Sequence, residues 1–187
     1  MAKKTKPKAK AKARAKAAPA QAPNPGEEFL KAFAREHATT VKVFLAYPAD
    51  KLDLQPHPKC KTARDLAWMT VLEQGMLQVA LTAGFDWSKP MPPPPAAPVT
   101  MVDIVVALEQ GFRKSVALIS KMKAAQFSET VKFPVAPKTI GDVPKIGFLW
   151  MLLCDQIHHR GQFSIYLRMA DGKVPSIYGP TADEPWV

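Results

Sequence analysis

Apolar residues recur once per helical turn from residue 25 to the residues before Pro48, and this spacing predicts a first helix. The stretch Asn24-Pro25-Gly26-Glu27 suits its start, because asparagine is a favoured N-cap, proline fits the first helical position and an acid fits the first turn. The face of this helix that points into the core is expected to carry Phe29, Phe33, Thr40 or Val41, and Phe44.

The same periodicity predicts a second helix from Thr62 to about Gly84. In Thr62-Ala-Arg-Asp65 a capping threonine is followed three residues later by an acid, and glycine is the residue that most often follows a helix C-terminus. The inward stripe of this helix is expected to carry Leu66, Met69, Glu73, Met76 or Leu77, and Ala80.

A third helix is predicted from Thr100 past Met122, and a fourth from near Pro144 to near Ala170. The alternation that is typical of strands is confined to short pieces such as residues 130–133. The pattern therefore favours an all-α domain, a four-helix bundle with long connections.

Two of the connections have compositions that predict how they behave. Residues 89–98 are rich in proline, which predicts a stiff, extended linker that covers a real distance and permits a topology other than simple up-down neighbours. Residues 173–180 contain too much proline and glycine for a helix but are too apolar for a disordered segment. They are expected to pack along the bundle.

The net charge of +10 is unevenly distributed along the chain. Eight of the 26 lysine and arginine residues and none of the 16 acids precede residue 25, so the remainder carries 18 basic and 16 acidic residues and is nearly neutral. We expect residues 1–24 to form a disordered tail that attracts nucleic acid without sequence preference, or that merely aids solubility, and residues 25–187 to form one domain. The basic residues are Lys3, Lys4, Lys6, Lys8, Lys10, Lys12, Arg14 and Lys16.

Cys60 and Cys154 are far apart and form no CxxC pair, so they are interpreted as buried thiols in a reducing compartment. No apolar segment follows the basic start, and the longest apolar run, residues 147–154, is well short of the roughly 20 residues that a membrane helix needs. A soluble, cytoplasmic protein with no membrane partner is expected.

Asp155 and His159 are the residues most suggestive of a functional site. They are four positions apart, so they share one face of the fourth helix with apolar residues that are expected to point into the bundle. A buried carboxylate and imidazole each need a partner. A metal ion would be one, and hydrogen bonds within the core or to Arg160 are the alternative.

The segment Asp155-Gln-Ile-His-His-Arg-Gly-Gln162, with residues 166–168 and 174–180 after it, resembles the last helix and closing tail of DinB-like (DinB/YfiT-type) proteins. Residues 56–59 and 62–68 resemble the approach to that family's second helix, and the resemblance spans roughly residues 27–184. It implies a four-helix bundle holding a divalent transition metal, often nickel or zinc. Three side chains would hold the ion, one from the second helix and two from the fourth, with positions left open for water or substrate.

The resemblance assigns His159 to one ligand position and places Asp155 where the family usually has another histidine. At the second-helix position this chain has Met69, whose thioether is a poor ligand for zinc or nickel and better suits the core. Glu73, one turn further on, could supply the third ligand, although an ion pair or a boundary position explains it equally well. An Asp, His and Glu set favours manganese, iron or zinc. His37 is a more remote substitute.

The neighbouring polar residues are expected to support the site and not to ligate. His158 points away from His159 around the helix, while Arg160 and Gln162 are expected to tie the helix to a loop or to the closing tail. His57, between two prolines, is interpreted as a loop residue.

Three functions remain open from the sequence: a metal-dependent transferase or hydrolase, a non-catalytic bundle whose metal site has degenerated at Met69, and a nucleic-acid-associated protein acting through its basic tail. A homodimer is a further expectation, because bundles that the chain resembles often pair through an exposed apolar helix face.

Overall fold

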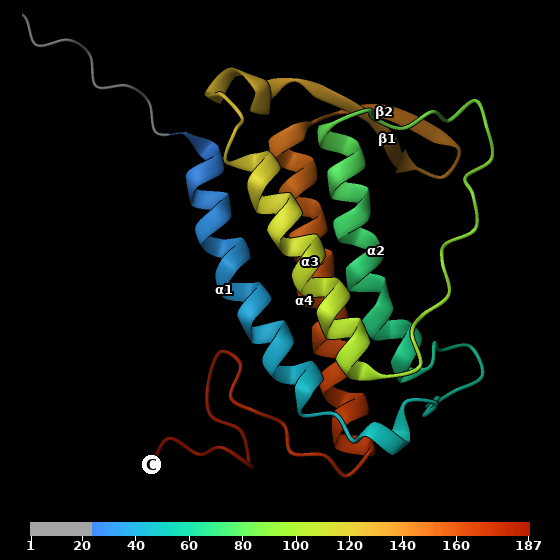
Figure 1. Cartoon of the computed structure of the whole chain (residues 1–187), viewed down its shortest axis with the longest axis vertical. Coiled ribbons are helices and arrows are strands. Elements are labelled where there is room, and N and C mark those ends of the chain that lie inside the picture. Colours follow the sequence, from blue (N-terminus) through green and yellow to red (C-terminus); the bar gives the residue numbers. More distant parts are fainter. Residues whose placement is uncertain (1–23) are drawn as a thin grey trace, which may run out of the picture.

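The computed structural model describes residues 24–187, and within them the chain forms four α-helices: α1 (Pro25–Leu45), α2 (Ala63–Leu81), α3 (Met101–Ile119) and α4 (Lys145–Met169). Short 3-10 turns, η1 (Ala49–Lys51) and η2 (Ala124–Ser128), and a hairpin of β1 (Thr130–Ala136) and β2 (Thr139–Pro144) complete the fold (Figure 1). The predicted four-helix bundle is confirmed. The predicted disordered tail lies outside the described residues, apart from Asn24.

The side chains that were expected to start three of the helices do so. Asn24 accepts a hydrogen bond from the backbone N–H of Gly26, and the hydroxyls of Thr62 and Thr100 accept from the third residue after each. The helix ends were predicted less well. α2 ends at Leu81, before Gly84, which adopts a φ of 72° and donates its N–H to the carbonyl of Val79. α3 ends at Ile119 and does not continue past residue 122.

The long proline-rich linker produces a bundle in which α2 and α3 run in the same direction. α1 and α4 run from the hairpin end of the bundle to the other end, and the linker returns along the outside of the bundle between α2 and α3 (Figure 1). The indole N–H of Trp68 holds the linker in place by donating to the carbonyl of Pro95 at 2.8 Å. α4 packs between α1 and α2, and α3 packs against the same two helices, so α2 and α4 are antiparallel neighbours.

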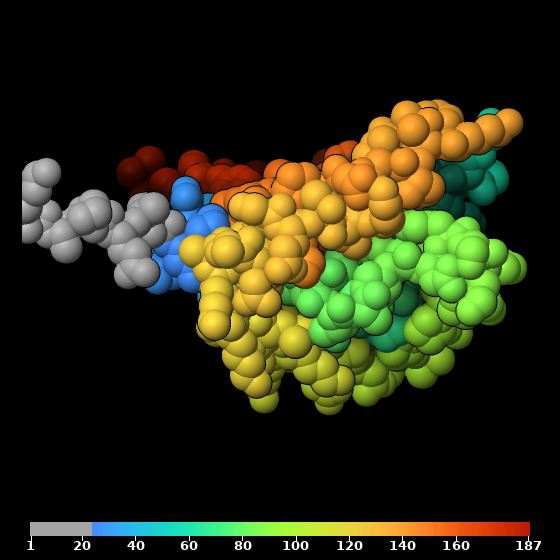
Figure 2. Space-filling view, turned by 90° about the horizontal axis from the view of Figure 1, so that it is seen from above, coloured from blue at the N-terminus to red at the C-terminus, as the bar shows by residue number. Residues whose placement is uncertain are grey.

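The hairpin was not predicted, and it covers one end of the bundle. β1 and β2 pair antiparallel, with Val131 opposite Val143 and Phe133 opposite Gly141. Pro134 is tolerated because each strand of a two-stranded sheet has a free edge, where a missing N–H removes no ladder hydrogen bond. Figure 2 shows the hairpin and the segment after α2 side by side over the helix ends, and the indole N–H of Trp87 donates to the carbonyl of Lys132 at 2.8 Å.

The core consists of two apolar clusters separated by a layer of buried polar residues. One cluster surrounds Phe44 and Phe163, and the other surrounds Phe33 and Phe148. In α1, α2 and α4 the buried polar positions lie between the residues of the two clusters, namely Glu36, His37, Thr40, Thr70, Glu73, Gln74, Gln156 and Arg160. Burying a polar group is costly without a partner, so this layer is where a functional site is expected. None of the helices between residues 24 and 187 is long and apolar enough to cross a membrane.

Arg160 ties α4 to α1 and to the C-terminal segment. Its side chain is 1% exposed, and its Nη2 lies 2.7 Å from Oε2 of Glu36. The hydroxyl of Tyr178 donates to the same oxygen at 2.6 Å, so the closing segment packs along the bundle as predicted. Because Arg160 is engaged with Glu36, the alternative in which it partners Asp155 or His159 is wrong.

Candidate metal-binding site

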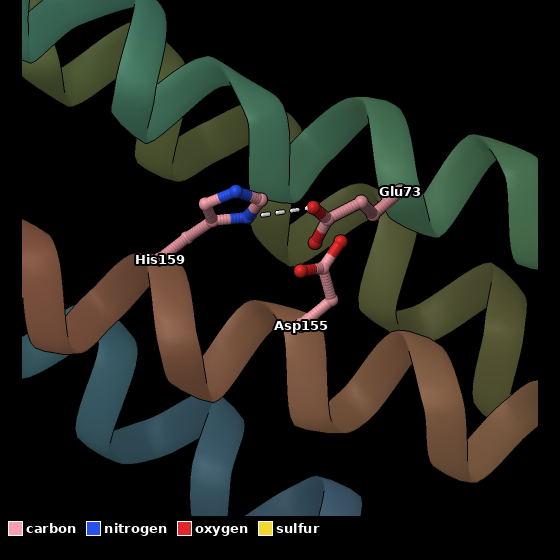
Figure 3. Close-up of side chains that lie close together, drawn as sticks. All are labelled: Glu73, Asp155 and His159. Carbon is pink, nitrogen blue, oxygen red and sulfur yellow. Dashed lines mark ion pairs between the residues drawn. The ribbon is translucent and has the colours of Figure 1, made fainter. Parts of the chain in front are cut away.

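Glu73 of α2 and Asp155 and His159 of α4 come together where the two antiparallel helices face each other. Each contributes one potential ligand atom, and these atoms all lie within 4.8 Å of one another. Figure 3 shows the two carboxylates and the imidazole pointing toward a common centre. The structure therefore brings together three residues that the sequence singled out.

The three side chains differ in exposure, and one of them departs from expectation. The side chain of Glu73 is 3% exposed and that of His159 is 16% exposed, whereas Asp155 is an exposed residue at the rim. The expectation that the Asp155 face points into the bundle is wrong for that residue. α4 instead buries Gln156 and Arg160, because Leu152, Phe163 and Leu167 orient the helix with those positions inward.

Glu73 is buried and forms an ion pair with His159, but no aligned hydrogen bond reaches its carboxylate from the described residues. Oε1 of Glu73 lies 2.8 Å from Nδ1 of His159, so the ion pair that was the alternative explanation of Glu73 is present, whereas the boundary position is not (Figure 3). The nitrogen and oxygen are not aligned for a hydrogen bond, and within residues 24–187 both oxygens of Glu73 and this nitrogen have no hydrogen-bond partner. Burial raises the pKa of Glu73, and the nearby Glu73 carboxylate raises the pKa of His159. Both shifts favour the protonated forms, and a metal ion would have to displace these protons to bind.

The donor set suits a divalent transition metal. Two carboxylates and one imidazole match the preferences of manganese, iron and zinc, and three protein ligands leave further coordination positions open. The buried oxygens of Glu73 support this fit, because no described residue forms an aligned hydrogen bond with them and a cation would satisfy them. Met69, one turn before Glu73, lines the hollow beside the site and is half-buried.

Two hollows border the site and differ in their linings. The larger, of about 610 Å³, includes Glu73 and Asp155 and is otherwise lined by Met69, Met76, Phe133, Met151, Leu152, Cys154 and His158. The other, of about 440 Å³, includes His159 and is lined by Lys59, Cys60, Lys61, Leu66, Gln162, Ile165 and Tyr166. One hollow is thus rich in apolar and thioether groups, and the other has two lysines at its edge.

The remaining candidates lie beside the site or away from it. Nε2 of His158 is 2.9 Å from Nε2 of Gln162, and both side chains are exposed on α4. His37 is remote: its Nε2 contacts Oε1 of Glu109 at 3.1 Å, and its ring stacks on Phe112. His57 lies in the loop before α2, as predicted, where its Nδ1 accepts from the backbone of residue 59.

Some features of the region were mispredicted or missed. Cys60 and Cys154 are exposed and each lines one of the hollows, so the prediction of buried thiols is wrong. Composition and spacing could not place them, because the exposure of Cys154 depends on how α4 is rotated and that of Cys60 on the path of the loop before α2. Glu36 was also missed as the partner of Arg160, although its position on the Phe33 face of α1 was a usable sequence feature.

Comparison with known proteins agrees with the fold. The chain is 26% identical over 159 residues to the uncharacterized protein YrdA of Bacillus subtilis, covering 84% of this chain and 90% of YrdA. A DinB-like protein of Bacillus cereus superposes with a TM-score of 0.67 at 23% identity, covering 81% of this chain and 97% of the other. The DinB-like protein YjoA of B. subtilis superposes with a TM-score of 0.62 at 15% identity, covering 80% and 97%. The model of the DinB family matches residues 20–186, and the chain therefore belongs to the DinB family.

Proposed function

We propose that Glu73, Asp155 and His159 bind one divalent transition metal ion, and that the protein is a metal-dependent enzyme of the transferase or hydrolase class. The observation that carries the proposal is the Glu73 carboxylate, which is buried, has no aligned hydrogen bond from the described residues and faces two further potential ligands on α4, Asp155 and His159. Stability alone does not account for this carboxylate, because its burial is costly and the misaligned ion pair with His159 leaves its oxygens without hydrogen bonds from the described residues.

Each ligand has a distinct place in the proposed site. Glu73 supplies the inner carboxylate from α2, His159 supplies a half-buried imidazole, and Asp155 closes the site at the rim. A zinc, nickel, manganese or iron ion held there would polarise a substrate oxygen or lower the pKa of a bound water or thiol. The exposed side of the site, beside Asp155, is the direction from which a substrate would approach.

The two hollows favour a transferase over a simple hydrolase. A hydrolase needs room for one substrate and water, whereas this site borders two hollows of different chemistry. Lys59 and Lys61 suit an anionic molecule, and Met69, Met76 and Met151 suit an apolar one, because thioethers adapt to irregular shapes. A thiol-transferase-like reaction fits this arrangement: the sulfur of a thiol that carries an anionic group would displace a leaving group from an apolar acceptor, and the thiol proton would pass to solvent or to the leaving group.

Metal binding is tested by elemental analysis of the tag-free protein after incubation with each candidate metal and removal of excess ion. We expect about one equivalent per chain for the unmodified protein and a loss of at least tenfold in affinity for Glu73→Gln, Asp155→Asn and His159→Gln. Asp142→Asn is the matched control, because that exposed acid lies on the hairpin and pairs with Lys132. Equal retention by Asp155→Asn and by the unmodified protein would overturn the assignment.

Met69 supports a second candidate, a non-catalytic bundle whose metal site has degenerated. This residue occupies the position where the family that the chain resembles has its second-helix histidine, and it borders the same hollow as Glu73. Under this alternative Met69→His should create metal binding where the unmodified protein has none. Tight binding by the unmodified protein rejects it.

A further inference from the structure

The larger hollow beside Glu73 and Asp155 is lined by many sulfur atoms. Three of the eight methionines and one of the two cysteines of the chain line it, namely Met69, Met76, Met151 and Cys154. Methionine and cysteine usually fill apolar cores, but Met151 is 40% exposed and Cys154 is also exposed. Packing within the chain therefore does not account for these two sulfur atoms at the surface.

Cys154 and His158 form a pair on the exposed side of α4. They are four positions apart, so their side chains lie on the same side of the helix, one turn apart. Both residues are exposed and both line the larger hollow. The amide of Gln162 contacts Nε2 of His158 at 2.9 Å, and such a contact at one ring nitrogen orients an imidazole that ligates through the other. α4 therefore presents a thiol and an oriented imidazole to one hollow.

Met76 of α2 lies at the level of Cys154. α2 and α4 are antiparallel neighbours, and Glu73 faces the level between Asp155 and His159 (Figure 3). Met76 is three residues further along α2, so it lies about three residues earlier along α4, which is the level of Cys154. Met76 also lines the larger hollow. Two helices therefore bring sulfur atoms to the same part of this hollow.

We propose that Cys154, His158 and Met76 bind one copper(I) ion in the larger hollow. Thiolate and thioether sulfur select copper(I) over the divalent ions that prefer carboxylates, and imidazole also suits copper. The three residues therefore supply a donor set that differs from the two carboxylates and one imidazole proposed for the divalent ion. None of them is a ligand in that site, so this inference goes beyond the proposed function and does not depend on it.

The charges of the hollow suit a singly charged ion at Cys154. On binding, the Cys154 thiol would lose its proton to solvent, and the thiolate would balance the single positive charge of copper(I). A neutral ion pair of this kind costs less to place beside the apolar side chains of Phe133 and Leu152, which line the same hollow, than a divalent ion would. The carboxylates of Glu73 and Asp155 would likewise balance the two charges of a divalent ion. Each proposed ion thus has ligands that match it in both softness and charge.

The first test titrates the tag-free full chain with copper(I), without oxygen, against the coloured copper(I) chelator bicinchoninate. We expect the unmodified protein to retain about one equivalent. Removing a side chain that only supports a ligand costs about 10- to 100-fold in metal affinity, so loss of a ligand should cost at least about 100-fold in Cys154→Ser and at least about tenfold in Met76→Leu. Cys60→Ser is the matched control, because Cys60 is the other exposed thiol and lines the other hollow.

Circular dichroism checks that each of these variants folds. Position 154 is exposed, and leucine nearly matches the volume of methionine, so both ligand variants should fold. No retention of copper(I) by the unmodified protein, equal retention by Cys154→Ser, or an equal loss in Cys60→Ser would overturn the proposal.

The second test separates this site from the divalent one. Copper K-edge absorption of the loaded chain should show two sulfur neighbours and one nitrogen neighbour, and Met76→Leu should leave one sulfur. Glu73→Gln should leave the copper(I) affinity unchanged while it weakens binding of the divalent ion, and Cys154→Ser should do the reverse, so failure of one site is distinguishable from failure of the other. A copper(I) affinity that falls in Glu73→Gln as much as in Cys154→Ser, or a copper neighbourhood without sulfur, contradicts the proposal.

Discussion

At the scale of single residues, two buried glutamates behave differently. Glu36 is satisfied by Arg160 and Tyr178, whereas Glu73, equally buried, has one misaligned ion pair with His159 and no hydrogen bond from the described residues to either oxygen. The first stabilises the fold through its hydrogen bonds and charge pairing. We expect the second to reduce stability and to remain available to a ligand. This contrast separates a structural carboxylate from a functional one within the same polar layer of the core.

Replacing Glu73 by glutamine should therefore stabilise the metal-free protein while weakening metal binding. The amide has nearly the same shape but carries no charge to desolvate, and His159 can lose its proton once its ion-pair partner is gone. We therefore expect the free energy of unfolding in chelator to rise by about 1 kcal/mol. Urea denaturation monitored by circular dichroism measures the change. Glu36→Gln is the comparison, and it should destabilise; a Glu73→Gln protein less stable than the unmodified one would contradict this account.

The sequence identified the candidate ligands because their spacing and helix positions are local properties. Glu73 lies on the apolar stripe of its helix, and Asp155 and His159 are separated by one helical turn. How exposed each of them is could not be predicted from the sequence. The rotation of α4 about its axis depends on which of its polar residues finds a buried partner on a neighbouring helix. Arg160 is held inward by Glu36, which lies 124 positions earlier in the chain, and this contact places Asp155 at the rim.

At the scale of the elements, helix starts could be predicted and one connection could not. Asn24, Thr62 and Thr100 act as caps through bonds to residues nearby in sequence, so their pattern was sufficient. The hairpin depends instead on contacts that are distant in sequence. Phe133 packs on Phe148 and on Phe85, with ring centroids 4.9 and 5.5 Å apart. A strand of ordinary length containing a proline gives little local indication of such packing.

Glu36 links α1 to α4 and to the closing segment, so we expect the free energy of unfolding to depend on the protonation of Glu36 and hence on pH. Burial alone would raise the pKa of Glu36, but hydrogen bonds from Tyr178 and Arg160 and the charge of Arg160 outweigh it and hold the pKa below 4.5. A lowered pKa means that this stabilisation is present above the unfolded-state value and is lost as the pH falls through the folded-state value.

Glu36→Gln should therefore cost about 3 kcal/mol of unfolding free energy near neutral pH, because it leaves Arg160 buried without a countercharge. The difference between the variant and the unmodified protein should shrink as the pH is lowered from about 5 toward 3. Urea titrations at each pH measure it. Glu129→Gln, which alters an exposed ion pair with Lys145, serves as the control. A difference that stays constant over this range would argue against the assignment.

At the scale of the whole molecule, the charged residues divide the sequence into a nearly neutral body, residues 25–187, and a basic tail, residues 1–24. The eight basic residues before residue 25 account for most of the net charge of +10. The DinB family assignment concerns the body, and it leaves the tail without a role. A polycation without acids binds polyanions by releasing their counterions, so non-specific association with nucleic acid is a proposal that concerns the tail alone.

Replacing the eight basic tail residues by glutamine should abolish weak binding to duplex DNA while leaving the thermal melting of the bundle unchanged. For the unmodified chain, affinity should fall by roughly a thousandfold between about 50 and 200 mM salt, as expected when most of these charges contact phosphates. Fluorescence anisotropy with a labelled duplex of arbitrary sequence measures both effects. Equal affinity of the two proteins would reject the proposal.

The central claim, a metal ion shared by α2 and α4, is tested most directly by anomalous diffraction from crystals of the metal-loaded protein. We expect one peak about 2.0 to 2.2 Å from a carboxylate oxygen of Glu73, a carboxylate oxygen of Asp155 and a ring nitrogen of His159. A peak that lies elsewhere, or no peak in crystals of protein that was saturated with metal, would contradict the claim.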